Sequence, residues 1–220
     1  MSPSDKIVDV YVETGVKRVF VSALDWPGWT RSGKDEKAAL EKLAAYAPRY
    51  AKVPKAARIA FPDAEPPFKV VERIKGNATT DFGAPAIHAS GDVKALSKEQ
   101  AQRIGVLLTA SWKVFDSVVA TAPAELRKGP RGGGRDRDKI ADHIIDAESA
   151  YASKLGIRMK PPRRDDAAGV PAWRNAITDT IQASVGASQQ IEKRWPPRYA
   201  ARRMAWHLLD HAWEIEDRSD

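Results

Sequence analysis

The stretch MAWHLLDHAWEIEDR, residues 204–218, has the apolar spacing of an amphipathic helix. We predict that this helix runs over residues 198–217. His207 and His211 lie four positions apart, so their side chains share one face of the helix, about one turn from each other. Both fall at the edge of the apolar stripe, which turns them toward the protein interior or its rim. Two imidazoles placed in this way can hold one metal ion if a third ligand comes from elsewhere.

We expect the third ligand to be His143. Residues 136–155 form a second predicted helix, which Gly156 ends, and His143 lies on the flank of its apolar stripe. That stripe consists of Ile140, Ile144, Ala147, Tyr151 and Leu155. Three neutral imidazoles suit a divalent transition metal such as Zn, Ni or Fe(II). The alternative is that each histidine is a packed, hydrogen-bonded residue, which is the usual role of one histidine on a helix edge.

Two more helices complete the predicted C-terminal part. Residues 97–120 carry apolar side chains at helical spacing, and Ser97 followed by Glu99 or Gln100 is typical of a capping box. A further helix is expected over residues 171–193, before Pro196 and Pro197. Four helices joined by modest loops predict an up-down four-helix bundle over residues 94–220.

The first 93 residues have a different pattern. Residues 5–13 and 17–24 are rich in β-branched side chains and predict a two-stranded hairpin. A helix capped by Ser32 or Gly33 and ended by Pro48 should follow.

Residues 68–74 predict a third strand. Residues 77–95 are expected to be a loop with one short strand around Ile87. The expected fold class is therefore α+β, with a small β-β-α-β module over residues 1–93 before the helices.

Composition narrows the function classes. The 220 residues carry a net charge of +7 and no cysteine, so disulfides, thiolate metal sites and a cysteine nucleophile are excluded. No apolar run approaches the roughly 20 residues that span a bilayer, and no signal sequence leads the chain, so we expect a cytoplasmic protein without membrane contact. Basic residues gather at 127–139 and 160–164, both in Gly- or Pro-rich connections. A solvated basic surface is a better explanation for them than a nucleic-acid footprint.

Residues 135–148, RDRDKIADHIIDAE, and residues 206–214, WHLLDHAWE, resemble two helices of the DinB/YfiT-like bundle superfamily. In that family one histidine of the second helix and a His-x-x-x-His pair of the last helix bind a divalent metal. His143, His207 and His211 match these positions in type and order. Members include thiol S-transferases that use mycothiol or bacillithiol and a mycothiol-dependent maleylpyruvate isomerase. The resemblance implies a metal-dependent thiol transferase or hydrolase that acts on a small-molecule electrophile, with a low-molecular-weight thiol as a second cofactor.

The N-terminal part resembles the HicB-like antitoxin fold. The resemblance rests on residues 23–29, ALDWPGW, between the hairpin and a helix containing residues 38–40, AAL. Trp29 replaces the small residue usual in that family. The resemblance implies a module that binds RNA or a protein partner, whereas the alternative is a small α/β module that packs on the helices.

Glu148 falls within the apolar stripe of its helix, where a carboxylate needs a partner. It is a candidate for a catalytic role as a base, or for orienting a metal-bound histidine, although a structural salt bridge is the simpler expectation. Asp210 and Glu214 are close enough in sequence to His207 and His211 to hold a ligand histidine in one tautomer.

His88 has no helical partner, and we expect it to be a surface or packing residue. Trp206 and Trp213 are expected to pack on the N-terminal module or on a second copy in a homodimer. Three functions follow from these observations: a metal-dependent enzyme, a non-catalytic metal-binding or regulatory protein, and a structural dimer with a vestigial site.

Overall fold

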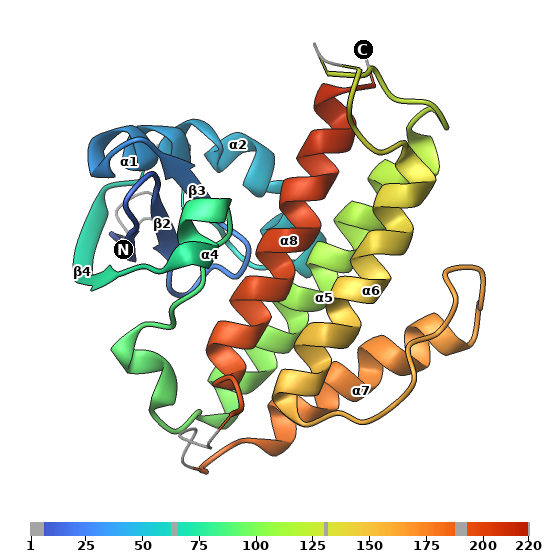
Figure 1. Ribbon diagram of the computed structural model, residues 1–220. Helices are drawn as coiled ribbons and strands as arrows, with labels where there is room; N and C mark the ends of the chain where they lie inside the picture. Colours follow the sequence, from blue (N-terminus) through green and yellow to red (C-terminus); the bar gives the residue numbers. More distant parts are fainter. Residues whose placement is uncertain (1–6, 63–65, 130–131, 188–192, 220) are drawn as a thin grey trace.

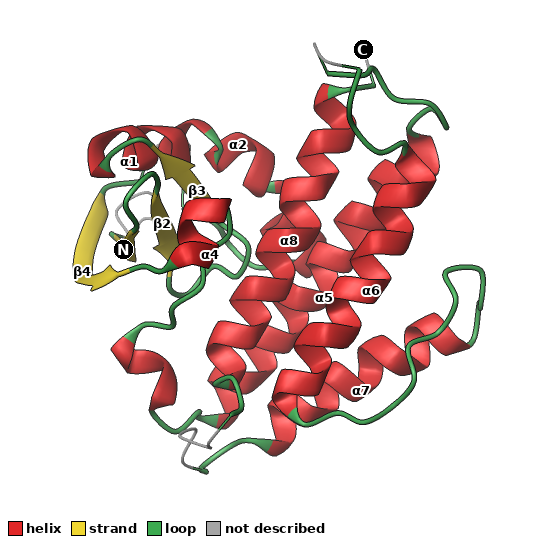
Figure 2. Cartoon of the chain, in the orientation of Figure 1, coloured by secondary structure: helices red, strands yellow, loops and turns green. Residues whose placement is uncertain are grey.

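The N-terminal part is a four-stranded mixed sheet, which precedes the long helices (Figures 1 and 2). The computed structural model describes residues 7–62, 66–129, 132–187 and 193–219. Within them the strands are β1 (Val8–Thr14), β2 (Val19–Ala23), β3 (Thr30–Gly33) and β4 (Phe68–Lys75). Their order in the sheet is β3-β2-β1-β4, with antiparallel pairing from β1 to β2 and from β2 to β3 and parallel pairing from β1 to β4.

The parallel pair needs a crossover, which three short helices supply. These are α1 (Glu36–Ala45), α2 (Ala47–Tyr50) and α3 (Lys52–Ala57). The side chain of Asp35 caps α1 by accepting from the Ala38 N–H at 2.8 Å. The stacked rings of Trp29 and Tyr50, 5.4 Å apart, lie in the core that these helices share with the sheet.

Both faces of the central strand β1 are covered, because most of its side chains are buried. Val10 and Val12 point into the core beneath α1, whereas Tyr11 and Glu13 point to the opposite face. There Glu13 accepts from the backbone N–H groups of Ala86 and Ile87 at 3.0–3.1 Å. A buried strand carboxylate thus fixes the connection that leads from the sheet to the helices.

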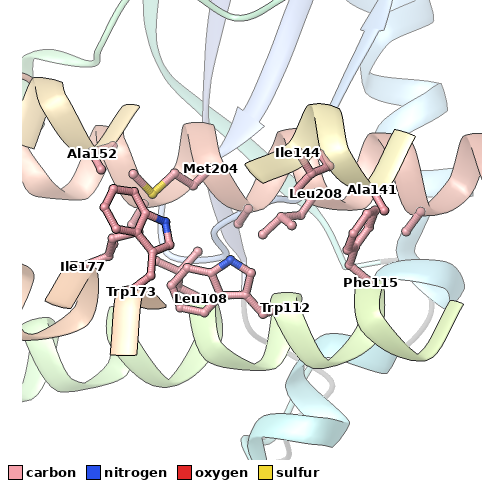
Figure 3. Packing of buried hydrophobic residues seen from close by; sticks show 14 of the residues in the cluster. Leu108, Trp112, Phe115, Ala141, Ile144, Ala152, Trp173, Ile177, Met204 and Leu208 are labelled. Atoms are coloured by element: carbon pink, nitrogen blue, oxygen red, sulfur yellow. The ribbon is translucent and has the colours of Figure 1, made fainter. Parts of the chain in front are cut away.

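Four longer helices follow: α5 (Lys98–Thr121), α6 (Arg137–Leu155), α7 (Gly169–Ala183) and α8 (Pro197–Asp217). The capping box of Ser97 and Gln100 is formed at the start of α5, and Gly156, with φ +90°, ends α6. Side chains from all four helices build one core, in which the indole rings of Trp112 and Trp173 are central (Figure 3). In Figure 1, α8 lies between the sheet and α6, and α7 is inclined to the other three helices.

α5 is long and apolar enough, by length and composition, to cross a membrane. Half of its most apolar window is buried, and the helix packs against α3, α7 and α8. Its apolar composition is therefore explained by its position in the core.

The sheet and the long helices share a second core. Leu107 and Ala110 of α5 and Leu209 and Trp213 of α8 pack with the strands and with α1. Gly28 permits a close approach of the two parts: its φ is +93°, and a Cβ added there would lie 2.6 Å from Leu209 Cδ1. The 93/94 boundary expected from the sequence stays a prediction, but the two parts are joined by buried apolar contacts.

Three local expectations were wrong. Ser32 and Gly33 belong to β3, which pairs with the edge of β2, so Asp35 caps the helix instead. The expected end of that helix before Pro48 is confirmed, because α1 ends at Ala45; Pro48 itself lies in the first turn of α2, where its missing N–H is tolerated.

No strand forms around Ile87. The described residues there hold a short helix, α4 (Ala78–Phe82), and the 3₁₀ turn η2 (Ser90–Val93). The helix expected over residues 171–193 ends at Ala183, because the chain turns to let the Gly186 N–H donate to Leu96 O at 3.0 Å. Residues 188–192 of that expected helix lie outside the described residues.

Candidate metal centre

α6 and α8 bring the three predicted histidines together. His143 extends from α6 toward the side of α8 that carries His207 and His211, and all three are partly buried. One ring nitrogen from each lies within 4.8 Å of the other two. The ring centroids of His143 are 5.1 Å from His207 and 5.3 Å from His211. The three side chains therefore lie close enough to hold one metal ion.

The α8 pair has the spacing of ligands to one ion. The Nε2 atoms of His207 and His211 are 3.2 Å apart. Two nitrogens bound to tetrahedral zinc at about 2.0–2.1 Å would be separated by about 3.3 Å. A ring nitrogen of His143 lies within 4.8 Å of this pair, so His143 is placed to supply the third ligand.

Burial keeps the imidazoles of His143 and His207 neutral. The pKa of His207 is lowered to about 2, mainly by burial and in addition by the neighbouring charges of His211 and Arg203. Burial is also the main reason why the pKa of His143 is lowered, with His211 as the next cause. A neutral imidazole retains the lone pair that a metal needs, so neither residue must first lose a proton near neutral pH.

Glu214 orients His211. Its Oε2 is 2.7 Å from His211 Nδ1, and its Oε1 accepts from Arg218 Nη1 at 2.6 Å. The bond to His211 is the main reason why the pKa of Glu214 is lowered, so this carboxylate is ionised and holds a proton on Nδ1. Nε2 then carries the lone pair, directed toward His207. Asp210, the other acid considered from the sequence, instead pairs with Arg31 of β3 at 2.8 Å.

Two aromatic rings border His207. The Tyr151 ring of α6 lies 5.8 Å from the imidazole, and the Trp206 ring stacks on it at 5.9 Å with an interplanar angle of 25°. Trp206 also contacts the ring of Phe20 of β2 edge to face. Of the two expected packing partners, the N-terminal module and a second copy, it is therefore the N-terminal module that Trp206 contacts. Arg203, one turn before His207, lies over both bordering rings. The sequence analysis did not select Arg203, although its i−4 position relative to His207 was a usable signal.

Glu148 lies in the core and is not a member of the histidine group. It follows His143 by five positions, or about 140° around the helix. Trp112 Nε1 donates to its Oε1, and its Oε2 has no hydrogen-bond partner among the described residues. Burial raises the pKa of Glu148 to about 7, against the opposing effect of Arg174. Its catalytic role stays a prediction.

His88 is exposed on the loop before η2, where its Nδ1 lies 3.1 Å from Ala89 O. It takes no part in the histidine group.

Comparison with known proteins identifies no relative of this chain. No protein-family model, curated protein or solved structure matches the chain.

Proposed function

We propose that this protein is a divalent-metal-dependent enzyme of the DinB-like type, in which α5–α8 correspond to the family's four-helix bundle. The observation that carries the proposal is the convergence of His143, His207 and His211 between α6 and α8. The order of these residues, one histidine on the second long helix and a pair on the last, supports the assignment. The proposed reaction is thiol transfer to, or hydrolysis of, a small-molecule electrophile.

The donor set fits a transition metal. Three imidazole nitrogens suit Zn, Ni or Fe(II), and they leave at least one coordination position for an exogenous ligand. A bound divalent ion would act as a Lewis acid that lowers the pKa of a thiol or water. The protein's own part is to keep the imidazoles of His143 and His207 neutral by burial and to hold the His211 tautomer through Glu214.

Metal analysis tests the proposal directly. The tag-free chain, reconstituted separately with Zn²⁺, Ni²⁺ and Fe²⁺, should retain about one equivalent of one of these ions. His207→Ala should lose it while circular dichroism shows a folded protein. His88→Ala is the matched control, because it removes an exposed histidine outside the group. Absence of stoichiometric metal in the wild type, or equal loss in both variants, would refute the proposal.

The reaction type needs a second measurement. A chromogenic haloarene and a chromogenic ester are supplied to the metal-loaded protein, with and without a low-molecular-weight thiol. Metal-dependent turnover of the haloarene only with thiol would support the transferase, whereas metal-dependent turnover of the ester without thiol would support the hydrolase. No metal-dependent turnover of either probe would count against the enzymatic part of the proposal.

A further inference from the structure

Arg203 is a buried arginine without a hydrogen-bonding partner. Its exposed fraction is 8%, and no acceptor or carboxylate among the described residues bonds to it. Nη1 is fully shielded from solvent and has no acceptor. The adjacent Arg202, which is 4% exposed, differs because its guanidinium pairs with the buried carboxylate of Asp92. The charge of Arg202 is therefore balanced by a carboxylate, whereas no carboxylate among the described residues balances that of Arg203.

The surroundings of Arg203 compensate its charge only in part. Its guanidinium carbon lies 4.5 Å from the Trp206 ring centroid and 5.2 Å from that of Tyr151. Cation–π contacts stabilise the charge, but they satisfy none of the five N–H donors. A buried guanidinium nitrogen without an acceptor, such as Nη1, is costly unless an anion reaches it. The two rings also restrict the orientation of the guanidinium, which favours a planar, two-pronged partner.

Arg203 belongs to the same face of α8 as the metal-site residues. It precedes His207 by four residues and His211 by eight, so successive members of the row are about 6 Å apart along the helix axis. Its positive charge is close enough to lower the pKa of His207. Tyr151 and Trp206 contact both Arg203 and His207, and so form a shared wall.

We propose that Arg203 binds the carboxylate of the substrate, so that the enzyme acts on small organic acids whose reacting atom lies about one helical turn from that carboxylate. The inference rests on the proposed function for the role of the histidines, but the arginine contact itself does not require a metal. One buried guanidinium balances one negative charge and matches the two oxygens of a carboxylate in a bidentate pair. A phosphate ester, which carries up to two charges, is the less suitable ligand for this single arginine.

Binding measurements on the zinc-reconstituted full chain test the proposal. The probes are acetate, benzoate and indole-3-acetate, each with its neutral amide, and phenyl phosphate. We expect at least one carboxylate to bind the wild type at least 10-fold more tightly than its amide, and more tightly than phenyl phosphate. Arg203→Met should remove this preference while metal content stays unchanged, and Arg203→Lys should recover only part of it.

Arg135→Met is the matched control. Arg135 is exposed, yet its charge also lowers the pKa of His143 and His207. If the carboxylate were attracted only by the general field, both methionine variants would weaken binding alike. If it pairs with Arg203, Arg135→Met should change the affinity by less than about threefold. Equal binding of all acids and amides by the wild type, or unchanged binding by Arg203→Met, would overturn the proposal.

Thermal unfolding without metal separates this proposal from the metal site. In chelator, the preferred carboxylate should raise the melting temperature of the wild type and leave that of Arg203→Met unchanged. Without any ligand, Arg203→Met should be at least as stable as the wild type, because an unpaired buried charge is removed. A destabilised variant together with no carboxylate effect on the wild type would show that Arg203 is a structural residue. A chain that binds no metal but passes this test would refute the proposed function and retain the carboxylate site.

Discussion

The replacement Glu148→Gln should change how the stability of the protein depends on pH. Glu148 is 2% exposed, bonded by Trp112 through one oxygen and unpartnered at the other. Burial raises the pKa of this carboxyl group to about 7 from its ordinary value of 4.5. Glutamine retains the oxygen that accepts from Trp112 but cannot ionise. The variant therefore isolates the cost of ionising one carboxyl group in the core.

The sign follows from proton binding. Between pH 4.5 and 7 the unfolded chain loses the proton of Glu148 while the folded chain retains it, so the free energy of unfolding falls as the pH rises. Each pH unit between the two pKa values contributes about 1.4 kcal/mol, which gives about 3 kcal/mol over the whole range. Glutamine does not ionise, so the free energy of unfolding of the variant does not fall for this reason. Its stability relative to the wild type should therefore increase by about 3 kcal/mol from pH 4.5 to pH 7.5.

Urea unfolding in chelator, at half-unit steps from pH 4.5 to pH 8, measures this difference. Glu125→Gln is the control, because Glu125 is exposed and its replacement should change stability by no more than about 0.5 kcal/mol. A stability difference between Glu148→Gln and the wild type that stays constant within about 1 kcal/mol would refute the reasoning. The same variant tests the catalytic role: unchanged metal-dependent turnover would remove Glu148 from the candidates.

Three further predictions concern the histidines, the buried ion pair and the basic surface. In chelator, the free energy of unfolding of the wild type should fall by about 1.4 kcal/mol per pH unit relative to that of His207→Gln as the pH falls below about 6.5. The reason is that the unfolded chain binds a proton at His207, whereas the buried imidazole of the folded chain stays neutral. Parallel urea titrations of the two proteins check this. Asp92→Ala should destabilise the protein by about 3–5 kcal/mol by leaving Arg202 buried and unpaired, whereas the double variant Asp92→Leu, Arg202→Met should recover most of the loss in the same urea assay. In a gel shift at low salt, RNA should form no salt-sensitive complex through residues 127–139, and a tight complex would instead favour the regulatory alternative.

The helix face that each histidine occupies could be predicted because it depends on local geometry, whereas the meeting of α6 and α8 was expected from the family resemblance. Helical periodicity fixes the angle of each side chain, so the flank position of His143 and the i,i+4 pair of α8 follow from spacing alone. The capping box at Ser97 and the C-terminal Gly156 are equally local. These signals place α5, α6 and α8 to within about two residues.

Features that depend on distant partners could not be predicted. The four residues of β3 have no strand-like alternation, and they are extended because β2 offers an edge to pair with. α7 ends early because a backbone group of Leu96, far away in sequence, accepts from Gly186. Arg202 and Arg203 are identical neighbours in sequence, and only the position of Asp92 makes one of them paired. Contacts of this kind are set by tertiary structure.

α8 faces two partners at once, with its histidines toward α6 and with Leu209 and Trp213 toward the sheet. Insertion or deletion of one residue near Ala205 would rotate everything that follows by 100°. His207 and His211 would then turn away from His143, and Leu209 would leave the gap that Gly28 keeps open for it. Substitutions along this helix can be compensated one at a time, but a change of length cannot. In evolving relatives of this chain, α8 should therefore tolerate replacement and resist insertion or deletion.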